Sequence, residues 1–70
     1  MRTFLDNLKL RLDSDPDACI EVGRAEWEKS GFFIPKYKEY PSFRQLMCWA
    51  EDNGYQAYLR QENFNVVISR

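Results

Sequence analysis

Aromatic residues are unusually abundant in this chain and are concentrated in its second half. The 70 residues include five Phe, four Tyr and two Trp, and most of these rings fall between Trp27 and Tyr58. A chain of this length buries only roughly 60% of the surface that its unfolded form exposes. We therefore expect several rings to stay at the surface, where Tyr and Trp typically anchor interfaces with partners.

The side chains that carry most enzyme chemistry are scarce. The sequence has no histidine, which is the commonest general base and metal ligand, and its two cysteines are Cys19 and Cys48. The acidic segment 13–17 opens like a calcium loop, but Ala18 stands where that loop needs Gly and Arg24 where it needs Glu. The three glycines are isolated, so no phosphate-binding loop is present. We expect no catalytic site, no metal and no cofactor, and a protein that is not an enzyme.

Length and charge limit the class of protein. Seventy residues predict one compact domain, 1–70. The first residues carry Asp6 where a signal peptide would be apolar, so we expect a cytoplasmic protein with free thiols. The net charge of −1 lacks the basic excess of a duplex-DNA binder. Segment 13–28 is acidic and segment 29–44 is basic, and such charge runs commonly form solvated faces.

The N-terminal segment predicts a helix over residues 1–12. Thr3 and Asp6 have the spacing of a capping box. One side of the helical wheel is apolar, while Leu10 projects from the opposite side. The residues of the apolar stripe are Met1, Phe4, Leu5, Leu8 and Leu12.

A second helix is predicted from Asp15-Pro16 to about Ser30, ending at Gly31. Pro suits the first helical position, and Gly is the usual residue after a helix end. The helix would be apolar over most of its circumference. The competing prediction is a strand over 18–22, because Ala18, Ile20 and Val22 alternate with other residues.

Segment 32–38 looks extended, and Pro35 limits it to an edge strand because proline cannot donate a backbone hydrogen bond. A third helix is predicted to begin at Ser42, which would cap it together with Gln45, and to end at Asn53-Gly54.

Two alternating segments, 55–61 and 64–70, predict a C-terminal hairpin. Glu62-Asn63 lies between them, and Asn tolerates the positive φ of a tight turn. The predicted fold class is α+β, with two N-terminal helices, a third helix, and a small antiparallel sheet ending in a C-terminal β-hairpin.

Aromatic and cationic residues near the middle and end of the chain predict a partner-binding surface. We interpret the chain as a non-enzymatic protein–protein interaction module, similar in type to the small regulators and inhibitors of bacteria and their phages. The alternative is a single-stranded nucleic-acid binder that uses aromatics and Lys or Arg on a sheet face. The candidate partner-binding residues are Lys36, Tyr37, Lys38, Tyr40, Trp49, Tyr58 and Arg60.

Self-association is a further prediction, since a chain this short is close to the lower size limit for independent stability. A two-fold homodimer is the simplest form. We expect the N-terminal half to supply the contact, through Leu10, Ile20 and Trp27.

Overall fold

The computed structural model describes residues 3–70 and shows an α+β fold, as the sequence predicts. Three α-helices and one 3-10 turn accompany a three-stranded antiparallel sheet, and the chain ends in the predicted hairpin. The elements in chain order are α1 (Phe4–Ser14), β1 (Cys19–Val22), α2 (Arg24–Lys29), η1 (Pro35–Tyr37), α3 (Ser42–Asp52), β2 (Gln56–Arg60) and β3 (Asn65–Ser69).

The sheet has the order β1-β3-β2, so the last strand of the chain lies in the middle. Ile20 of β1 pairs with Ile68 of β3, and Ala57 of β2 pairs with the same Ile68 from the other side. Alternate residues of a strand point to opposite faces. The sheet therefore has an apolar inner face and an outer face that includes Glu21 and Tyr58.

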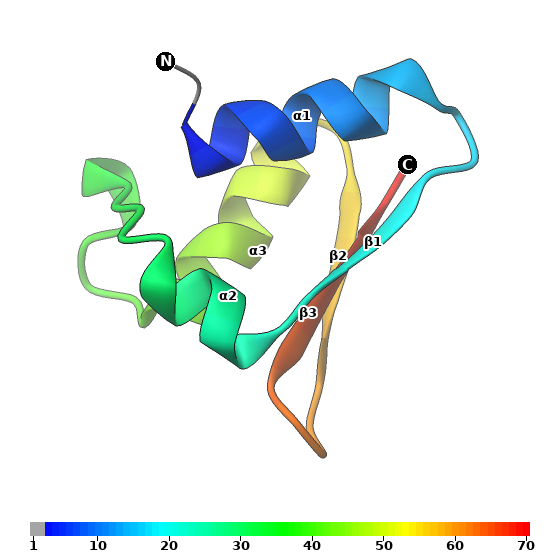
Figure 1. Ribbon diagram of the computed structural model, residues 1–70. Helices are drawn as coiled ribbons and strands as arrows, with labels where there is room; N and C mark the ends of the chain where they lie inside the picture. Colours follow the sequence, from blue (N-terminus) through cyan, green and yellow to red (C-terminus); the bar gives the residue numbers. More distant parts are fainter. Residues whose placement is uncertain (1–2) are drawn as a thin grey trace.

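All three helices lie on the inner face of the sheet, and Figure 1 shows the opposite face without a covering element. The helices and the inner face enclose one core, in which Leu12, Leu46 and Ile68 are fully buried. Burial of such side chains contributes about 1.5–3 kcal/mol each. The core cluster consists of Leu8, Leu12, Ile20, Val22, Trp27, Leu46, Ala50, Tyr55, Val66 and Ile68.

The start of α1 follows from local sequence. The Thr3 hydroxyl accepts from the Asp6 amide at 3.1 Å, and the Asp6 carboxylate accepts from the Thr3 amide, so the capping box is confirmed. Met1, which the apolar stripe includes, lies outside the described residues. The helix continues two residues beyond the predicted end, to Ser14.

The single helix predicted over 16–30 is wrong in its first half. Residues 19–22 form β1, which was the competing prediction, and only Arg24–Lys29 are helical. The cause is the partner strand: β3 pairs with β1, and the register places Ile20 and Val22 on the same inner face. On a helix these two side chains would diverge. Asp15 begins no helix, because its carboxylate accepts from the Asp17 amide in a turn.

The edge strand predicted over 32–38 is also wrong, because this segment forms a 3-10 turn at Pro35–Tyr37 and no sheet pairing. The segment lies along neither edge strand, β1 or β2, because the Gln45 side chain of α3 forms hydrogen bonds with Ile34 and Tyr40 instead. The third helix is confirmed over Ser42–Asp52, but its N-cap is Pro41 and Ser42 makes no capping hydrogen bond. The Gln45 side chain does not close a capping box. Its carboxamide forms hydrogen bonds with the backbone of Ile34 and Tyr40 in the preceding loop instead.

The hairpin turn differs from the prediction at one residue. The positive φ falls on Phe64, at 58°, and not on Asn63. Asn63 instead accepts from the Asn65 amide at 3.0 Å. A bulky residue rarely adopts this conformation, and tertiary contacts hold it: the Trp27 indole donates to the Phe64 carbonyl at 3.0 Å, and the Phe64 ring meets Phe43 edge-on.

Candidate functional site

Residues 34–40 form a surface loop whose two ends are attached to one buried side chain. The Gln45 carboxamide of α3 accepts from the Ile34 amide at 2.9 Å and donates to the Tyr40 carbonyl at 3.0 Å. Gln45 is 5% exposed, and both hydrogen-bonding atoms of its side chain are used. We call residues 34–40 the docking loop. A single side chain thus fixes the distance between the two ends of this loop.

A second attachment holds the middle of the docking loop to the end of α3. The Tyr37 hydroxyl donates to the Asp52 carboxylate, and Lys36 Nζ lies 3.4 Å from the same oxygen. The hydrogen bond from Tyr37, supported by Lys36, holds the pKa of Asp52 below its ordinary value. The bond to Asp52 also raises the pKa of Tyr37. The loop is therefore held at both ends and in its middle.

The tyrosines of the docking loop form a small aromatic platform. The rings of Tyr37 and Tyr40 stack with centroids 6.0 Å apart, and the Arg44 guanidinium lies 5.2 Å from the Tyr40 centroid. Tyr40 remains 44% exposed. Residues 35–40 line a shallow hollow of about 350 Å³. Stacked rings beside cations can take up an apolar group together with an acidic one.

Phe33 adjoins the docking loop and is 61% exposed, more than any other large apolar side chain in the described part of the chain. Its neighbour Phe32 faces inward and stacks on Phe4 at 5.7 Å. Our sequence reasoning missed Phe33. The signal was available: two consecutive aromatics in an extended segment point to opposite sides, so only one of them can pack inward.

The outer face of the sheet is a second, separate surface. Tyr58 lies at the centre of this face and is 53% exposed. It pairs with the buried Val67 of β3. Arg60 Nε lies 3.3 Å from Glu21 Oε1, and Asn65 donates to Glu21 at 2.7 Å, so a polar network joins all three strands. The nearby Glu21 carboxylate raises the pKa of Arg60. The charge of Arg60 is thus already paired within the sheet.

A cluster of the same composition as the one at Asp52 attaches α1 to the core. The Tyr55 hydroxyl donates to Asp13 at 2.5 Å, and Lys9 Nζ lies 3.1 Å from the same carboxylate. The Tyr55 ring is 7% exposed and packs against Trp49 at 6.1 Å. The hydrogen bond from Tyr55 lowers the pKa of Asp13, while burial raises the pKa of Tyr55. This cluster is structural, since it joins α1 to the residue that precedes β2.

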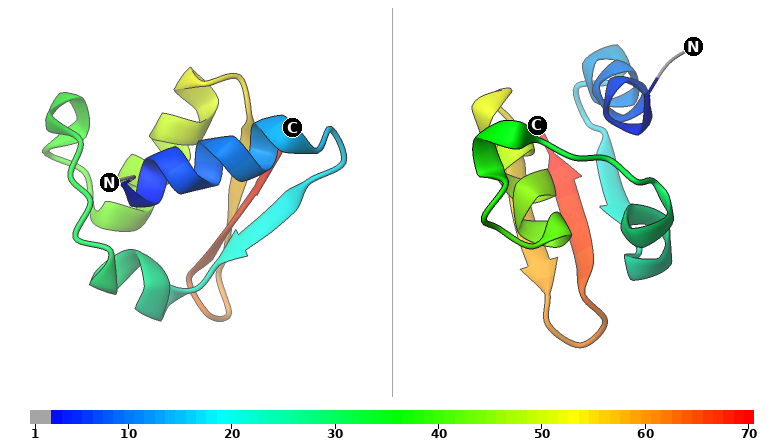
Figure 2. Two further views of the ribbon diagram at one scale, coloured as in Figure 1. Left: turned by 45° about the horizontal axis from the view of Figure 1, so that its top comes forward. Right: turned by 90° about the vertical axis from the view of Figure 1, so that its left-hand side faces the viewer.

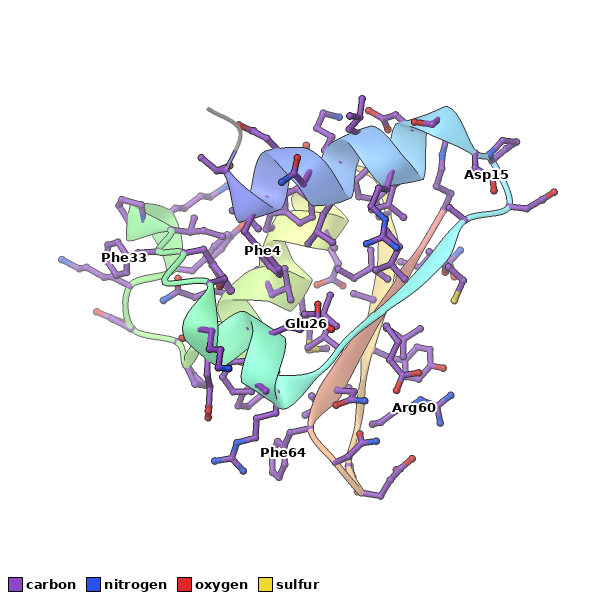
Figure 3. The ribbon with its side chains drawn as sticks, in the orientation of Figure 1. Phe4, Asp15, Glu26, Phe33, Arg60 and Phe64 are labelled. Atoms are coloured by element: carbon purple, nitrogen blue, oxygen red, sulfur yellow. The ribbon has the colours of Figure 1, made fainter. Side chains whose placement is uncertain are left out.

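The residues predicted to bind a partner fall into separate regions. Lys36, Tyr37, Lys38 and Tyr40 come together on the docking loop. Trp49 is only partly exposed and packs on Tyr55. Tyr58 and Arg60 lie on the outer face of the sheet. Figure 3 shows that Phe33 and Arg60 point out of opposite sides of the molecule, so the loop and the sheet face cannot form one continuous surface.

The three residues predicted for self-association differ in how far they are exposed. Ile20 is 7% exposed and Trp27 is 9% exposed, and both belong to the core of one chain. Leu10 is 47% exposed on α1. Because Ile20 and Trp27 pack within their own chain, only Leu10 of the three offers an apolar surface to a second copy. Self-association itself stays a prediction.

Two residues that fix the docking loop were not recognised from sequence. Gln45 looked like part of a capping box, and Asp52 had no assigned role. Gln45 bonds to Ile34 and Tyr40, which are 11 and 5 residues away, and Asp52 bonds to Tyr37, 15 residues away, in a loop without periodicity. A partial signal for Gln45 exists, because a buried amide must find hydrogen-bonding partners.

Within residues 3–70, no group of three His, Cys, Asp or Glu side chains is placed to hold a metal ion. Cys19 is exposed on β1, and Cys48 is partly exposed on α3. None of the helices in the described part of the chain has both the length and the apolar character needed to cross a bilayer. The arrangement of the docking loop offers hydrogen bonding, stacking and ion pairing.

No protein-family model, curated protein or solved structure matches this chain.

Proposed function

We propose that this chain is a non-enzymatic protein-interaction module of the cytoplasm, a regulator or inhibitor, and that the docking loop is its binding surface. The observation that carries the proposal is the double hydrogen bond of Gln45 to Ile34 and Tyr40. A loop held in one shape before binding loses less conformational entropy when a partner arrives. Exposed tyrosines on such a loop are efficient anchors, since they offer a large contact area with few rotatable bonds.

The charges around the loop indicate the kind of surface it suits. Lys36 is paired with Asp52, whereas neither Lys38 nor Arg44 takes part in any ion pair formed among residues 3–70. Phe33 adds an exposed apolar side chain next to them. The matching partner surface would combine an apolar pocket with acidic side chains at its rim, which is a common composition for protein interfaces.

The experiment is site-specific photo-crosslinking in a bacterial lysate treated with nuclease. A photoreactive phenylalanine analogue replaces Tyr40 in one variant and Tyr58 in a matched control on the sheet face. We expect one defined protein adduct from position 40 and none of the same mass from position 58. Identical adducts from both positions, or no protein adduct from position 40, would contradict the proposal.

Preorganisation of the loop can be tested without changing its surface. Gln45→Ala removes both hydrogen bonds at the ends of the loop and leaves Tyr37, Lys38 and Tyr40 in the sequence. We expect the yield of the position-40 adduct to fall about tenfold, the effect of losing about 1.4 kcal/mol. Circular dichroism and the unfolding midpoint would check that the fold persists. An unchanged yield would mean that the fixed loop shape is irrelevant to binding.

Single-stranded nucleic-acid binding is the second candidate. The exposed Tyr58 ring next to Arg60 on an open sheet face favours it, because bases stack on such rings. The pairing of Arg60 with Glu21 weakens it, since the cation is already neutralised. Binding of this kind must weaken steeply with salt. A fluorescent oligonucleotide that shows no binding at low ionic strength would exclude this candidate.

A further inference from the structure

The outer edge of β2 carries backbone groups that the chain itself leaves open. β2 pairs with β3 on one side only, and the right-hand view of Figure 2 shows it at the margin of the sheet. In an antiparallel strand, half of the amide and carbonyl groups point away from the paired strand. Among residues 3–70, no backbone group outside β3 hydrogen-bonds to Ala57, Tyr58 or Leu59.

β2 lacks the features that usually protect an edge. Natural edge strands are shortened, bulged, covered, or interrupted by Pro or Lys. The opposite edge, β1, is only four residues long and has Glu21 near its middle. β2 has five residues in unbroken one-to-one pairing from Gln56 to Arg60, and its only charge is at the end. Of the two edge strands, β2 is therefore better suited than β1 to pair with a further strand.

We infer that β2 pairs with β2 of a second copy of this chain, antiparallel about a two-fold axis at Tyr58, to form a continuous six-stranded sheet. Facing residues in a sheet must lie on the same face. The register centred on Tyr58 meets this condition and uses all five residues of the strand. It sets Gln56 opposite the partner's Arg60 and Ala57 opposite the partner's Leu59, so no like charges face each other.

A second copy suits this edge better than an unrelated strand. Arg60 is already paired with Glu21, so the edge has no free charge with which to select a different sequence. Ala57 and Leu59 lie on the inner face yet remain partly exposed, because no strand lies beyond them. The second copy would cover these two side chains with the same two side chains. Tyr58 would meet its own copy as a cross-strand aromatic pair, which favours pairing.

The edge of β2 is distinct from the docking loop, so pairing between two copies is tested independently of the proposed function. It also differs from the N-terminal contact predicted from Leu10, Ile20 and Trp27. Figure 2 shows α1 and β2 at opposite margins of the molecule in its right-hand view. A variant of α1 and a variant of β2 therefore distinguish the two dimer surfaces.

The test is sedimentation equilibrium of the purified chain up to about 1 mM, where even a millimolar Kd gives a visible dimer. We expect the wild type to dimerise and Tyr58→Lys to be monomeric, since the introduced lysines would face each other. Tyr58→Glu should also be monomeric. An equimolar mixture of the two variants should dimerise again, because opposite charges then meet across the axis. Tyr58 is 53% exposed, so both variants should keep the fold, which circular dichroism would verify.

Leu10→Glu is the matched control, because it places a charge on an exposed apolar site of α1 and leaves β2 intact. We expect this variant to dimerise like the wild type. A wild type that is monomeric at about 1 mM, a Tyr58→Lys variant that still dimerises, or a mixture that stays monomeric would overturn the inference. Loss of the dimer in Leu10→Glu alone would also overturn it, in favour of α1.

Discussion

Two clusters in this molecule each combine a tyrosine, a lysine and an aspartate, but they lie in different surroundings. At one, Tyr55 and Lys9 both bond to Asp13; at the other, Tyr37 and Lys36 both bond to Asp52. In each cluster the lysine also lies over the tyrosine ring, 5.7 Å from the centroid of Tyr55 and 5.4 Å from that of Tyr37. Hydrogen bonding and charge are therefore closely matched.

The difference between the clusters is the burial of the tyrosine ring. Tyr55 is 7% exposed and belongs to the core, whereas Tyr37 is partly exposed on the docking loop. The first cluster joins α1 to the core, and the second shapes a surface loop. We therefore expect the burial of the tyrosine ring, rather than the polar contacts, to determine how much each cluster stabilises the fold.

The largest expected effect comes from removing each ring. Tyr55→Ala deletes a buried aromatic and should lower the free energy of unfolding by about 3 kcal/mol or more. A chain of this size has roughly 4–10 kcal/mol in total. Tyr37→Ala should leave a cooperative transition close to that of the wild type. Urea denaturation followed by circular dichroism measures both, and equal losses would contradict the role assigned to burial.

Removing only the tyrosine hydroxyl groups measures the contribution of their hydrogen bonds, without the contribution of the rings. Tyr55→Phe should cost about 1 kcal/mol, the usual value of a hydrogen bond in a folded protein. Tyr37→Phe should change the urea midpoint less, while amide exchange in the docking loop becomes faster because the middle of the loop is released. A shift in the midpoint without faster exchange would show that Tyr37 supports the fold and not the loop.

Acid should weaken both clusters, and Asp13 more than Asp52 should determine the loss of stability. Hydrogen bonds from Tyr55 and Tyr37 hold the pKa values of the two carboxyl groups below their ordinary value. Their stabilisation is therefore present above about pH 4, the unfolded pKa, and is lost as the pH falls through the lowered folded pKa. The free energy of unfolding can be measured from neutral to acidic pH. It should fall less steeply with acid in Asp13→Asn than in Asp52→Asn. The reverse order would place the structural cluster at Asp52.

The smallest effect separates the causes of the two raised tyrosine pKa values. Burial is the main cause for Tyr55, whereas the hydrogen bond to Asp52 is the main cause for Tyr37. Asp52→Asn should therefore return the pKa of Tyr37 toward its ordinary value, while Asp13→Asn should leave the pKa of Tyr55 raised. Ultraviolet titration of phenolate formation measures both, with Tyr→Phe variants to assign each transition. If Tyr55 also returned to its ordinary pKa, its ring could not be buried as described.

The sequence predicted the features that depend on neighbouring residues. The Thr3 and Asp6 box starts α1, and Gly31 and Gly54 adopt the positive φ that follows a helix end. The alternation in 55–61 and 64–70 predicted the hairpin strands, which the structure forms over Gln56–Arg60 and Asn65–Ser69. Of the residues predicted to bind a partner, those on the docking loop could be grouped because they are close in sequence. Each of these features depends on interactions within a few residues, which a linear pattern records.

Only the tertiary structure decided the features that depend on distant partners. Residues 19–22 satisfy both a helix and a strand pattern until β3 supplies a pairing strand. In that register Val22 pairs with Val66, 44 positions later, and Cys19 pairs with Ser69, 50 positions later. The docking loop takes its shape from Gln45 and Asp52, and Phe64 keeps its positive φ because Trp27 bonds its carbonyl. These contacts close long loops, so their energy outweighs local preference only once the core has formed.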